Sequence, residues 1–351
     1  MDKRNLLRYV GNTGQLFGIK EYTLAGGRSK GVRAFDVRNG SGLEFTLLSD
    51  RCLDISALSL NGVNCGYLAQ PGIVAPEFYE PENAGALRSF FLGFLSTCGL
   101  RNVGSPCKDS GEAFGLHGRI SNIPAEEVCA STEWDDDVPV FSISGKMREA
   151  RFFGENLLLH RKISCRYGEN KITIENRVEN LGFNREPLQL LFHFNMGYPL
   201  LDEDAVLVSP TKTLTPRDAE AAKGSADYQR FQAPTPCYAE QVFYHDLKTT
   251  ENGDTCVALV NHRLEMGVTL RFSKEQLTNF GQWKQPGQGE YVLGMEPSNC
   301  FVTGRADARK KGTLQHIEPG ESKNFDITVE ILSGKNNLRA MEDEIGKFAK
   351  L

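Results

Sequence analysis

Short runs of alternating polar and apolar residues recur along most of the chain. In residues 171–178, Ile172, Ile174 and Val178 are separated by polar residues. Successive side chains of a β-strand point to opposite faces, so this spacing predicts a strand with one buried face. The same pattern occurs at residues 141–145, 157–165, 266–272 and 325–331.

Turn-forming residues separate these runs, and helical patterns are few. Turns are expected at residues 38–40, 61–62, 167–170, 251–254 and 318–320, which are rich in Asn, Gly, Asp and Pro. Residues 337–351 place Leu338, Met341, Ile345 and Phe348 near helical spacing, which predicts a C-terminal helix. Residues 216–228 lack a strong apolar stripe and are interpreted as a short surface helix or a loop.

Many strands with few helices between them predict an all-β protein, an antiparallel sandwich or barrel rather than a parallel α/β sheet. The chain has 351 residues and shows no internal repeat, low-complexity linker or break in composition. We therefore expect one domain over residues 1–351. The alternative is a boundary near residues 135–140, although Asp135-Asp136-Asp137 is more typical of a hairpin loop.

Composition limits the class of protein. The chain is 40% hydrophobic and 24% charged, with a net charge of −5, which is unlike a basic nucleic-acid binder. Nine cysteines, none in a CxxC pair, predict buried free thiols in a reducing compartment rather than disulfides or a zinc ribbon. No signal peptide and no apolar run of roughly 18 residues is visible, so we expect a cytoplasmic protein without a membrane partner.

Three distant segments carry the candidate chemistry. His117 lies between glycines in residues 115–119, His193 lies in an apolar strand at residues 192–199, and Glu296 precedes a proline in residues 294–297. Histidine can exchange a proton near neutral pH, and partial burial would raise the pKa of a carboxyl group and strengthen it as a base. These residues suit proton transfer at a sugar carbon.

Each of the three also has a purely structural interpretation. His193 could hydrogen bond to a neighbouring strand, His117 could lie in a polar turn, and Glu296 could be a surface residue at a strand end. Taken singly, each structural interpretation is at least as good as the functional one.

Further polar and aromatic residues are candidates for binding a substrate. Asn195 lies on the same side of its strand as His193, and Arg119 offers a fork of hydrogen-bond donors. Arg101 and Asn102 follow an apolar strand and could bind sugar hydroxyls. Trp283 could stack on a pyranose ring or belong to the core.

Two charged residues near the N-terminal end are harder to interpret. Arg51 and Asp54 could enter a cleft or form a structural ion pair, and we favour the ion pair. Arginines at positions 51, 101, 119 and 305 suggest, by residue type alone, a substrate that is an acidic sugar.

Together these segments resemble the aldose 1-epimerase (galactose mutarotase-like) superfamily, within it a divergent branch known only as a domain of unknown function. The resemblance covers nearly the whole chain and rests on four segments in the right order. They are Leu116-His117-Gly118, Phe192-His193-Phe194-Asn195, Gly294-Met295-Glu296-Pro297 and the strand after residues 314–321. It implies a large antiparallel β-supersandwich with an open cleft, and a small-molecule carbohydrate as partner.

The resemblance also implies roles for individual residues. His193 would be the general acid, Glu296 the general base, and His117 would bind or polarise the substrate. Arg101, or its neighbour Asn102, would match the family's substrate-binding arginine, although the motif around it is altered. The family's sugar-binding aspartate has only a weak match, Asp218. The implied activity is interconversion of sugar anomers by ring opening, with no metal or organic cofactor.

Two other functions use the same residues. His117, His193 and Glu296 could form a two-histidine, one-carboxylate metal site of a sugar isomerase or lyase. The chain could also be a non-catalytic carbohydrate-binding sandwich, but sugar binding alone requires neither an acid nor a base.

Overall fold

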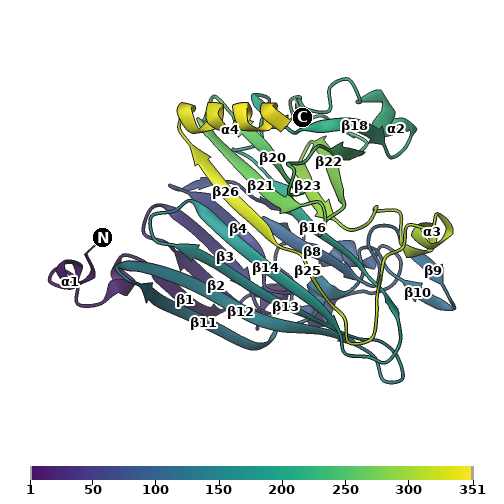
Figure 1. The fold of residues 1–351 in the computed structure, drawn as a ribbon, viewed down its shortest axis with the longest axis horizontal. Coiled ribbons are helices and arrows are strands. Elements are labelled where there is room, and N and C mark those ends of the chain that lie inside the picture. Colours follow the sequence, from purple (N-terminus) through teal and green to yellow (C-terminus); the bar gives the residue numbers. More distant parts are fainter. Residues whose placement is uncertain (1, 349–351) are drawn as a thin grey trace.

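The largest sheet has nine antiparallel strands. The computed structural model describes residues 2–348. The sheet runs in the order β11 (Glu126–Asp135), β12 (Val138–Ala150), β13 (Asn156–Arg166), β14 (Lys171–Asn180), β26 (Ile327–Ser333), β21 (Met266–Ser273), β20 (Asp254–Asn261) and β17 (Ala205–Val208), and β25 (Ser322–Asn324) also pairs with β14. Figure 1 shows β11–β14 as long neighbouring strands. Buried and half-buried residues alternate along β12, which gives the strand one core face, as the sequence pattern predicts.

A six-stranded and a five-stranded sheet complete the main architecture. The six-stranded sheet runs β18 (Thr211–Pro216), β19 (Gln241–Leu247), β22 (Asn279–Gly287), β23 (Glu290–Ser298), β16 (Gln189–Met196) and β8 (Leu95–Leu100). The five-stranded sheet runs β1 (Gly18–Thr23), β2 (Arg33–Arg38), β3 (Leu43–Leu48), β4 (Asp54–Leu60) and β5 (Val63–Asn64). Short pairs join β6 (Tyr67–Leu68) to β7 (Leu92–Gly93), β9 (Cys107–Asp109) to β10 (Glu112–Phe114), and β15 (Glu186–Pro187) to β24 (His316–Ile317).

Helices are short within the described residues, apart from the last one. The α-helices are α1 (Lys3–Leu6), α2 (Ala219–Lys223), α3 (Arg305–Lys310) and α4 (Lys335–Phe348). The 3₁₀ helices are η1 (Thr13–Gln15), η2 (Gly27–Ser29), η3 (Pro76–Phe78), η4 (Gly85–Arg88) and η5 (Ile120–Asn122). None of the helices in residues 2–348 is long and apolar enough to cross a membrane.

Helix α4 covers the outer face of the nine-stranded sheet and is drawn in yellow beside β20 in Figure 1. The four apolar residues that the sequence placed near helical spacing are all buried. They pack against Cys256, Ala258 and Val260 of β20. The predicted C-terminal helix is therefore confirmed as far as Phe348, and residues 349–351 of that prediction lie outside the described residues.

The three large sheets share one buried apolar cluster. It contains Phe35 of the five-stranded sheet, Phe194 of the six-stranded sheet and Ile174 of the nine-stranded sheet. The all-β antiparallel sandwich predicted from the sequence is confirmed. Asp136 and Asp137 form the turn between β11 and β12, as expected for a hairpin loop.

All nine cysteines are free, as the sequence predicted, but they are not all buried. Cys129 and Cys237 are exposed and Cys107 is half-buried. The expectation of buried thiols is wrong for these three, because Cys129 lies on the outer strand β11, Cys237 in a surface loop and Cys107 on the short strand β9.

Candidate functional site

Two neighbouring strands bring His193 and Glu296 together. Strand β16 pairs with β23 through Leu191↔Ser298 and Phe194↔Met295, a register that places His193 opposite Glu296. The His193 Nε2 atom lies 3.2 Å from Glu296 Oε1. The side chains are almost fully buried, with His193 4% and Glu296 2% exposed. The sequence brought these residues to attention separately, and the sheet register makes them a pair.

Glycines leave room for the carboxyl group of Glu296. A Cβ atom at Gly294 would lie 2.6 Å from Glu296 Oε1 and 3.2 Å from His193 Cε1. A Cβ atom at Gly281, which pairs with Glu296 in the sheet, would lie 3.1 Å from Glu296 Oε2. Any larger residue at position 294 would push the carboxyl group away from the imidazole. A glycine at position 294 is therefore a steric requirement of the pair.

Burial shifts the pKa values of the pair in opposite directions. Loss of water raises the pKa of Glu296 to about 8, and the negative charge of Glu240 adds to this shift. Loss of water lowers the pKa of His193 to about 4, and the neighbouring Asn195 amide opposes the shift only in part. At neutral pH the Glu296 carboxyl group is therefore protonated and the His193 imidazole is neutral. The two groups share one titratable proton, and it resides on Glu296.

A tight turn presents His117 next to this pair. The backbone of His117 is left-handed, with φ of 58°, and Gly118 follows with φ of 73°. The turn is held by hydrogen bonds from Gly99 N–H to His117 O (3.0 Å) and from His117 N–H to Gly104 O (2.9 Å). A Cβ atom at Gly118 would lie 2.3 Å from Gly99 O, so only glycine fits there.

The imidazole ring of His117 is neutral, and a backbone hydrogen bond determines which of its two nitrogens carries the proton. Burial, followed by the nearby His193, lowers the pKa of His117 to about 3. The Gly104 N–H donates to His117 Nδ1 at 3.4 Å. A neutral imidazole that accepts at Nδ1 carries its proton on Nε2, which is then free to donate to a ligand. The ring centroids of His117 and His193 are 5.8 Å apart.

A cavity of about 640 Å³ opens over these three residues. Apolar and aromatic side chains line it together with several polar and charged ones. Residues lining it include Tyr67, Gln70, Pro71, Phe90, His117, His193, Arg217, Glu240, Trp283, Gln285, Glu290, Val292 and Glu296. A larger cavity of about 990 Å³ lies over the five-stranded sheet and contains no histidine. The smaller cavity is therefore the candidate site, since it combines convergent polar groups with shifted pKa values.

Trp283 forms one wall of the cavity and is fixed by its indole nitrogen. Its ring meets that of His193 edge to face, at 5.4 Å between centroids. Trp283 Nε1 donates to Glu240 Oε2 at 2.8 Å, and Arg217 Nη2 lies 2.9 Å from Glu240 Oε1. Trp283 is half-buried and lines the cavity, so the expectation that it could face a ligand is compatible with its position.

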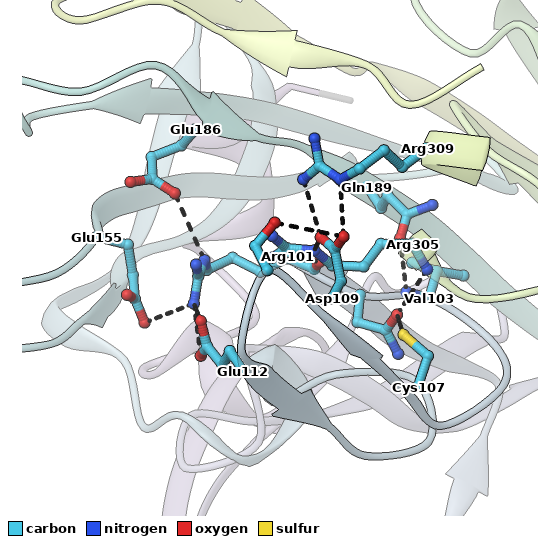
Figure 2. A network of polar contacts seen from close by, with 12 residues as sticks. Arg101, Val103, Cys107, Asp109, Glu112, Glu155, Glu186, Gln189, Arg305 and Arg309 are labelled. Carbon is cyan, nitrogen blue, oxygen red and sulfur yellow. Dashed lines mark hydrogen bonds and ion pairs between the residues drawn. The ribbon is translucent and has the colours of Figure 1, made fainter. Parts of the chain in front are cut away.

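Arg101, which the sequence suggested for substrate binding, lies outside the cavity. Its guanidinium Nη1 is 2.8 Å from Glu112 and 3.1 Å from Glu155, and its Nε is 3.6 Å from Glu186. Figure 2 shows the side chain surrounded by these carboxylates. A buried guanidinium held by three carboxylates is a structural cross-link, which joins the residue after β8 to β10, to the residue before β13 and to β15, and it is not presented to a ligand.

Three further expected binding residues do not line the cavity either. Asn102 donates to Gly115 O at 2.9 Å and accepts from Arg305 N–H, so it supports the turn that carries His117. Asn195 is fully buried and donates to the backbone oxygen of His193 at 2.8 Å. Arg119 is exposed and lies outside the set of lining residues.

The suggestion of an acidic substrate loses its basis, because it rested on four arginines that lie outside the cavity. Arg51 is buried and donates to the backbone oxygens of Ser121, Val74 and Ser89. Arg305 is paired with Asp109 at 2.7 Å. None of the four arginines at positions 51, 101, 119 and 305 lines the cavity.

The roles of Asp54 and Asp218 are structural. Asp54 pairs with Arg161 at 2.8 Å rather than with Arg51, so the structural ion pair exists with a different partner. Asp218 caps α2 by accepting from Ala221 N–H at 2.9 Å. Its neighbour Arg217 lines the cavity instead.

Several lining residues were missed by sequence reasoning. Glu240 lies in an irregular loop with no recognisable motif, and Gln285 and Glu290 lie near a strand turn that resembles many others. Arg217 adjoins the one aspartate that the resemblance did single out, but nothing local distinguishes it. In contrast, the alternation Trp283, Gln285 along β22 could have signalled a common face.

No group of three His, Cys, Asp or Glu side chains in residues 2–348 is arranged so that it could hold a metal ion. His117, His193 and Glu296 are neighbours around one cavity, yet they do not form such a group.

The chain resembles known proteins in both sequence and structure. A family model described as "Domain of unknown function (DUF4432)" matches residues 29–331. No similar sequence was found among curated proteins. A candidate aldose 1-epimerase from Klebsiella pneumoniae subsp. pneumoniae superimposes with a TM-score of 0.91 at 26% identity, over 96% of this chain and 91% of that chain.

More distant structures share the fold. A galactose mutarotase-like protein from Clostridium acetobutylicum has a TM-score of 0.64 at 14% identity, over 91% of this chain and 99% of that chain. A galactose 1-epimerase from Lactobacillus acidophilus has a TM-score of 0.59 at 12% identity, over 91% of this chain and 99% of that chain. These similarities confirm the supersandwich that the resemblance implied.

Proposed function

The chain belongs to the DUF4432 family and has the galactose mutarotase-like fold, and from this we propose that it is an isomerase that interconverts the anomers of an aldose. The observation that carries the proposal is the buried His193–Glu296 pair, with 3.2 Å between Nε2 and Oε1, in the candidate cavity. An acid and a base on one face of a substrate are what ring opening needs, whereas binding alone needs neither.

In the proposed reaction, two proton transfers accompany one bond cleavage. Glu296 takes the proton from the anomeric hydroxyl, and C1 becomes a carbonyl carbon as its bond to the ring oxygen breaks. His193 gives its proton to that ring oxygen. Rotation about the C1–C2 bond and closure from the opposite face produce the other anomer, and both side chains return to their starting states by the reverse transfers.

The resting His193–Glu296 pair can supply both the general base and the general acid without exchanging a proton with solvent. Transfer of the shared proton from Glu296 to His193, over the 3.2 Å contact, creates a carboxylate base and an imidazolium acid. Burial opposes both charges, so this state needs hydrogen bonds from the bound substrate. His117 and Trp283 line the same cavity, and in this proposal His117 Nε2 donates one to a sugar oxygen while Trp283 packs against the apolar side of the ring.

The pH dependence of the reaction tests this one-proton requirement. We expect kcat/KM to be bell-shaped, with limits near the pKa values of about 4 for His193 and about 8 for Glu296. Below the lower limit, both groups are protonated and no base is left. Above the upper limit, the carboxyl group has lost its proton, the imidazole is neutral and no acid is left.

The profile is measured from anomer exchange rates by NMR between pH 3 and 9, after subtraction of the uncatalysed rate at each pH. The rate in a variant with Glu220→Gln, which changes a carboxylate on α2 outside the cavity, serves as the control. A profile that rises steadily through pH 8, or one whose acid limit lies at the ordinary histidine pKa near 6.5, would contradict the shared proton.

A further inference from the structure

The cavity extends along two paired strands well beyond the acid–base pair. From Glu296 outward, the pairs Trp283↔Gly294, Gln285↔Val292 and Gly287↔Glu290 follow one another on β22 and β23. Residues at every second position lie on one face, so Glu296, Gly294, Val292 and Glu290 share a face. Four residues of a strand span ~13 Å and six span ~20 Å, which is longer than one pyranose ring.

Gln285 at the far end has an unused hydrogen-bond acceptor. Its side chain is 9% exposed, lines the cavity and donates through Nε2 to Glu290 Oε2 at 3.3 Å. Its Oε1 atom is buried and has no hydrogen-bond partner. The carboxylate of Glu290 accepts hydrogen bonds only, so it fixes the amide with its oxygen turned away. A buried acceptor without a donor is unfavourable, so a ligand hydroxyl that reached this oxygen would be stabilised there.

Other polar groups gather around Glu290. Gln70 Nε2 lies 3.4 Å from Glu290 Oε1 and 3.2 Å from Gly289 O, and Tyr67 O–H donates to the same backbone oxygen at 3.3 Å. All three side chains line the cavity. The far end thus combines amide, phenol and carboxylate groups from three separate segments, a set that suits sugar hydroxyls.

The charges around the cavity favour an uncharged ligand. Arg217 is the one Lys or Arg among its lining residues, and it is already paired with Asp218 at 2.8 Å and Glu240 at 2.9 Å. The carboxylates of Glu240 and Glu290 would repel an anion. Trp283, Val292 and Pro71 of the cavity lining supply apolar surface on which sugar rings can pack.

We propose that the Gln285–Glu290 end of the cavity is a second sugar subsite, and that the preferred substrate is an uncharged reducing disaccharide. Its reducing-end ring lies at His193 and Glu296 beside Trp283, and its second ring lies beyond Trp283, at Gln285 and Glu290. The inference rests on the proposed function for the position of the reducing end. The inference specifies the size and the charge of the substrate, which the acid–base pair alone does not indicate.

Calorimetric binding of matched sugars tests the subsite without relying on catalysis. Glucose is compared with maltose, cellobiose and lactose, which all end in glucose, and galactose is compared with 4-galactobiose. We expect at least one disaccharide to bind about 10-fold or more tightly than its reducing-end monosaccharide, which corresponds to ~1.4 kcal/mol.

Two variants in different segments test whether the tighter binding of the disaccharide depends on the subsite. Gln285→Ala should remove the preference for the disaccharide, and Gln70→Ala, a change at an exposed residue, should reduce it. Gln288→Ala serves as the matched control, because Gln288 lies on the same turn but does not line the cavity. The preference should persist in this control.

The outcomes separate the subsite from the catalytic proposal. Equal binding of monosaccharides and disaccharides, or a preference that survives both Gln285→Ala and Gln70→Ala, overturns the second subsite, whether or not anomer exchange is catalysed. A preference that depends on Gln285, without any acceleration of exchange, supports the subsite and overturns the isomerase. No binding of any of these sugars overturns both.

Discussion

Anomer exchange should slow by about 10²–10⁴-fold when Glu296 is replaced by glutamine, because a general base contributes roughly that factor. Glutamine has nearly the same shape and can still hydrogen bond to His193 Nε2, but it cannot accept the proton of the anomeric hydroxyl. The measurement is the exchange rate by NMR at saturating sugar, with the thermal unfolding midpoint as a check that the fold is unchanged.

A parallel substitution of the partner makes the test sharper. His193→Asn should cause a loss of similar size, and the double variant should lose little more, because acid and base act as a unit. Glu220→Gln, outside the cavity, should retain the normal rate. A Glu296→Gln variant that remained within about threefold of the normal rate would exclude Glu296 as the base, since even weak general bases contribute more.

The second large effect concerns stability. Replacing Asp54 with alanine should lower the free energy of unfolding by about 3–5 kcal/mol, because it leaves the buried guanidinium of Arg161 without its counter-charge. Both side chains are 0% exposed, and Arg161 Nη1 lies 2.8 Å from Asp54 Oδ1. Thr97 donates to Asp54 through its backbone N–H (2.9 Å) and its hydroxyl (2.6 Å).

This cluster connects the three large sheets, which is why its loss should be costly. Asp54 belongs to β4, Thr97 to β8 and Arg161 to β13, each from a different sheet. Urea unfolding of Asp54→Ala is compared with that of Glu318→Gln, which removes the exposed pair between Glu318 and Arg185. The exposed pair should contribute at most about 1 kcal/mol. Equal losses in the two variants would contradict a cross-sheet role for Asp54.

The sequence predicted the fold class and the catalytic candidates for reasons that the structure makes clear. Alternation along residues 171–178 reflects one buried face of β14, and the burial of α4 follows its apolar spacing. His193 and Glu296 were found because each interrupts an apolar strand. Their 3.2 Å contact could not be predicted, since it depends on the register of two strands about 100 residues apart.

The binding residues were harder to predict, because the sequence around a charged residue does not show which distant residues it pairs with in the fold. Arg101 has a local sequence suited to a ligand, but Glu112, Glu155 and Glu186 reach it from elsewhere in the chain and neutralise it (Figure 2). Conversely, Gln285 is an unremarkable strand residue in the sequence. Its importance comes from Glu290, which fixes its amide across the β22–β23 turn.

Anomer exchange of glucose, galactose and their disaccharides by two-dimensional exchange NMR, with the unmodified protein at pH 6, tests the central claim most directly. At this pH the His193–Glu296 pair holds one proton. The account predicts exchange above the uncatalysed rate, in proportion to protein concentration and unchanged by EDTA. Exchange no faster than in buffer for every sugar, or acceleration that EDTA abolishes, would contradict it.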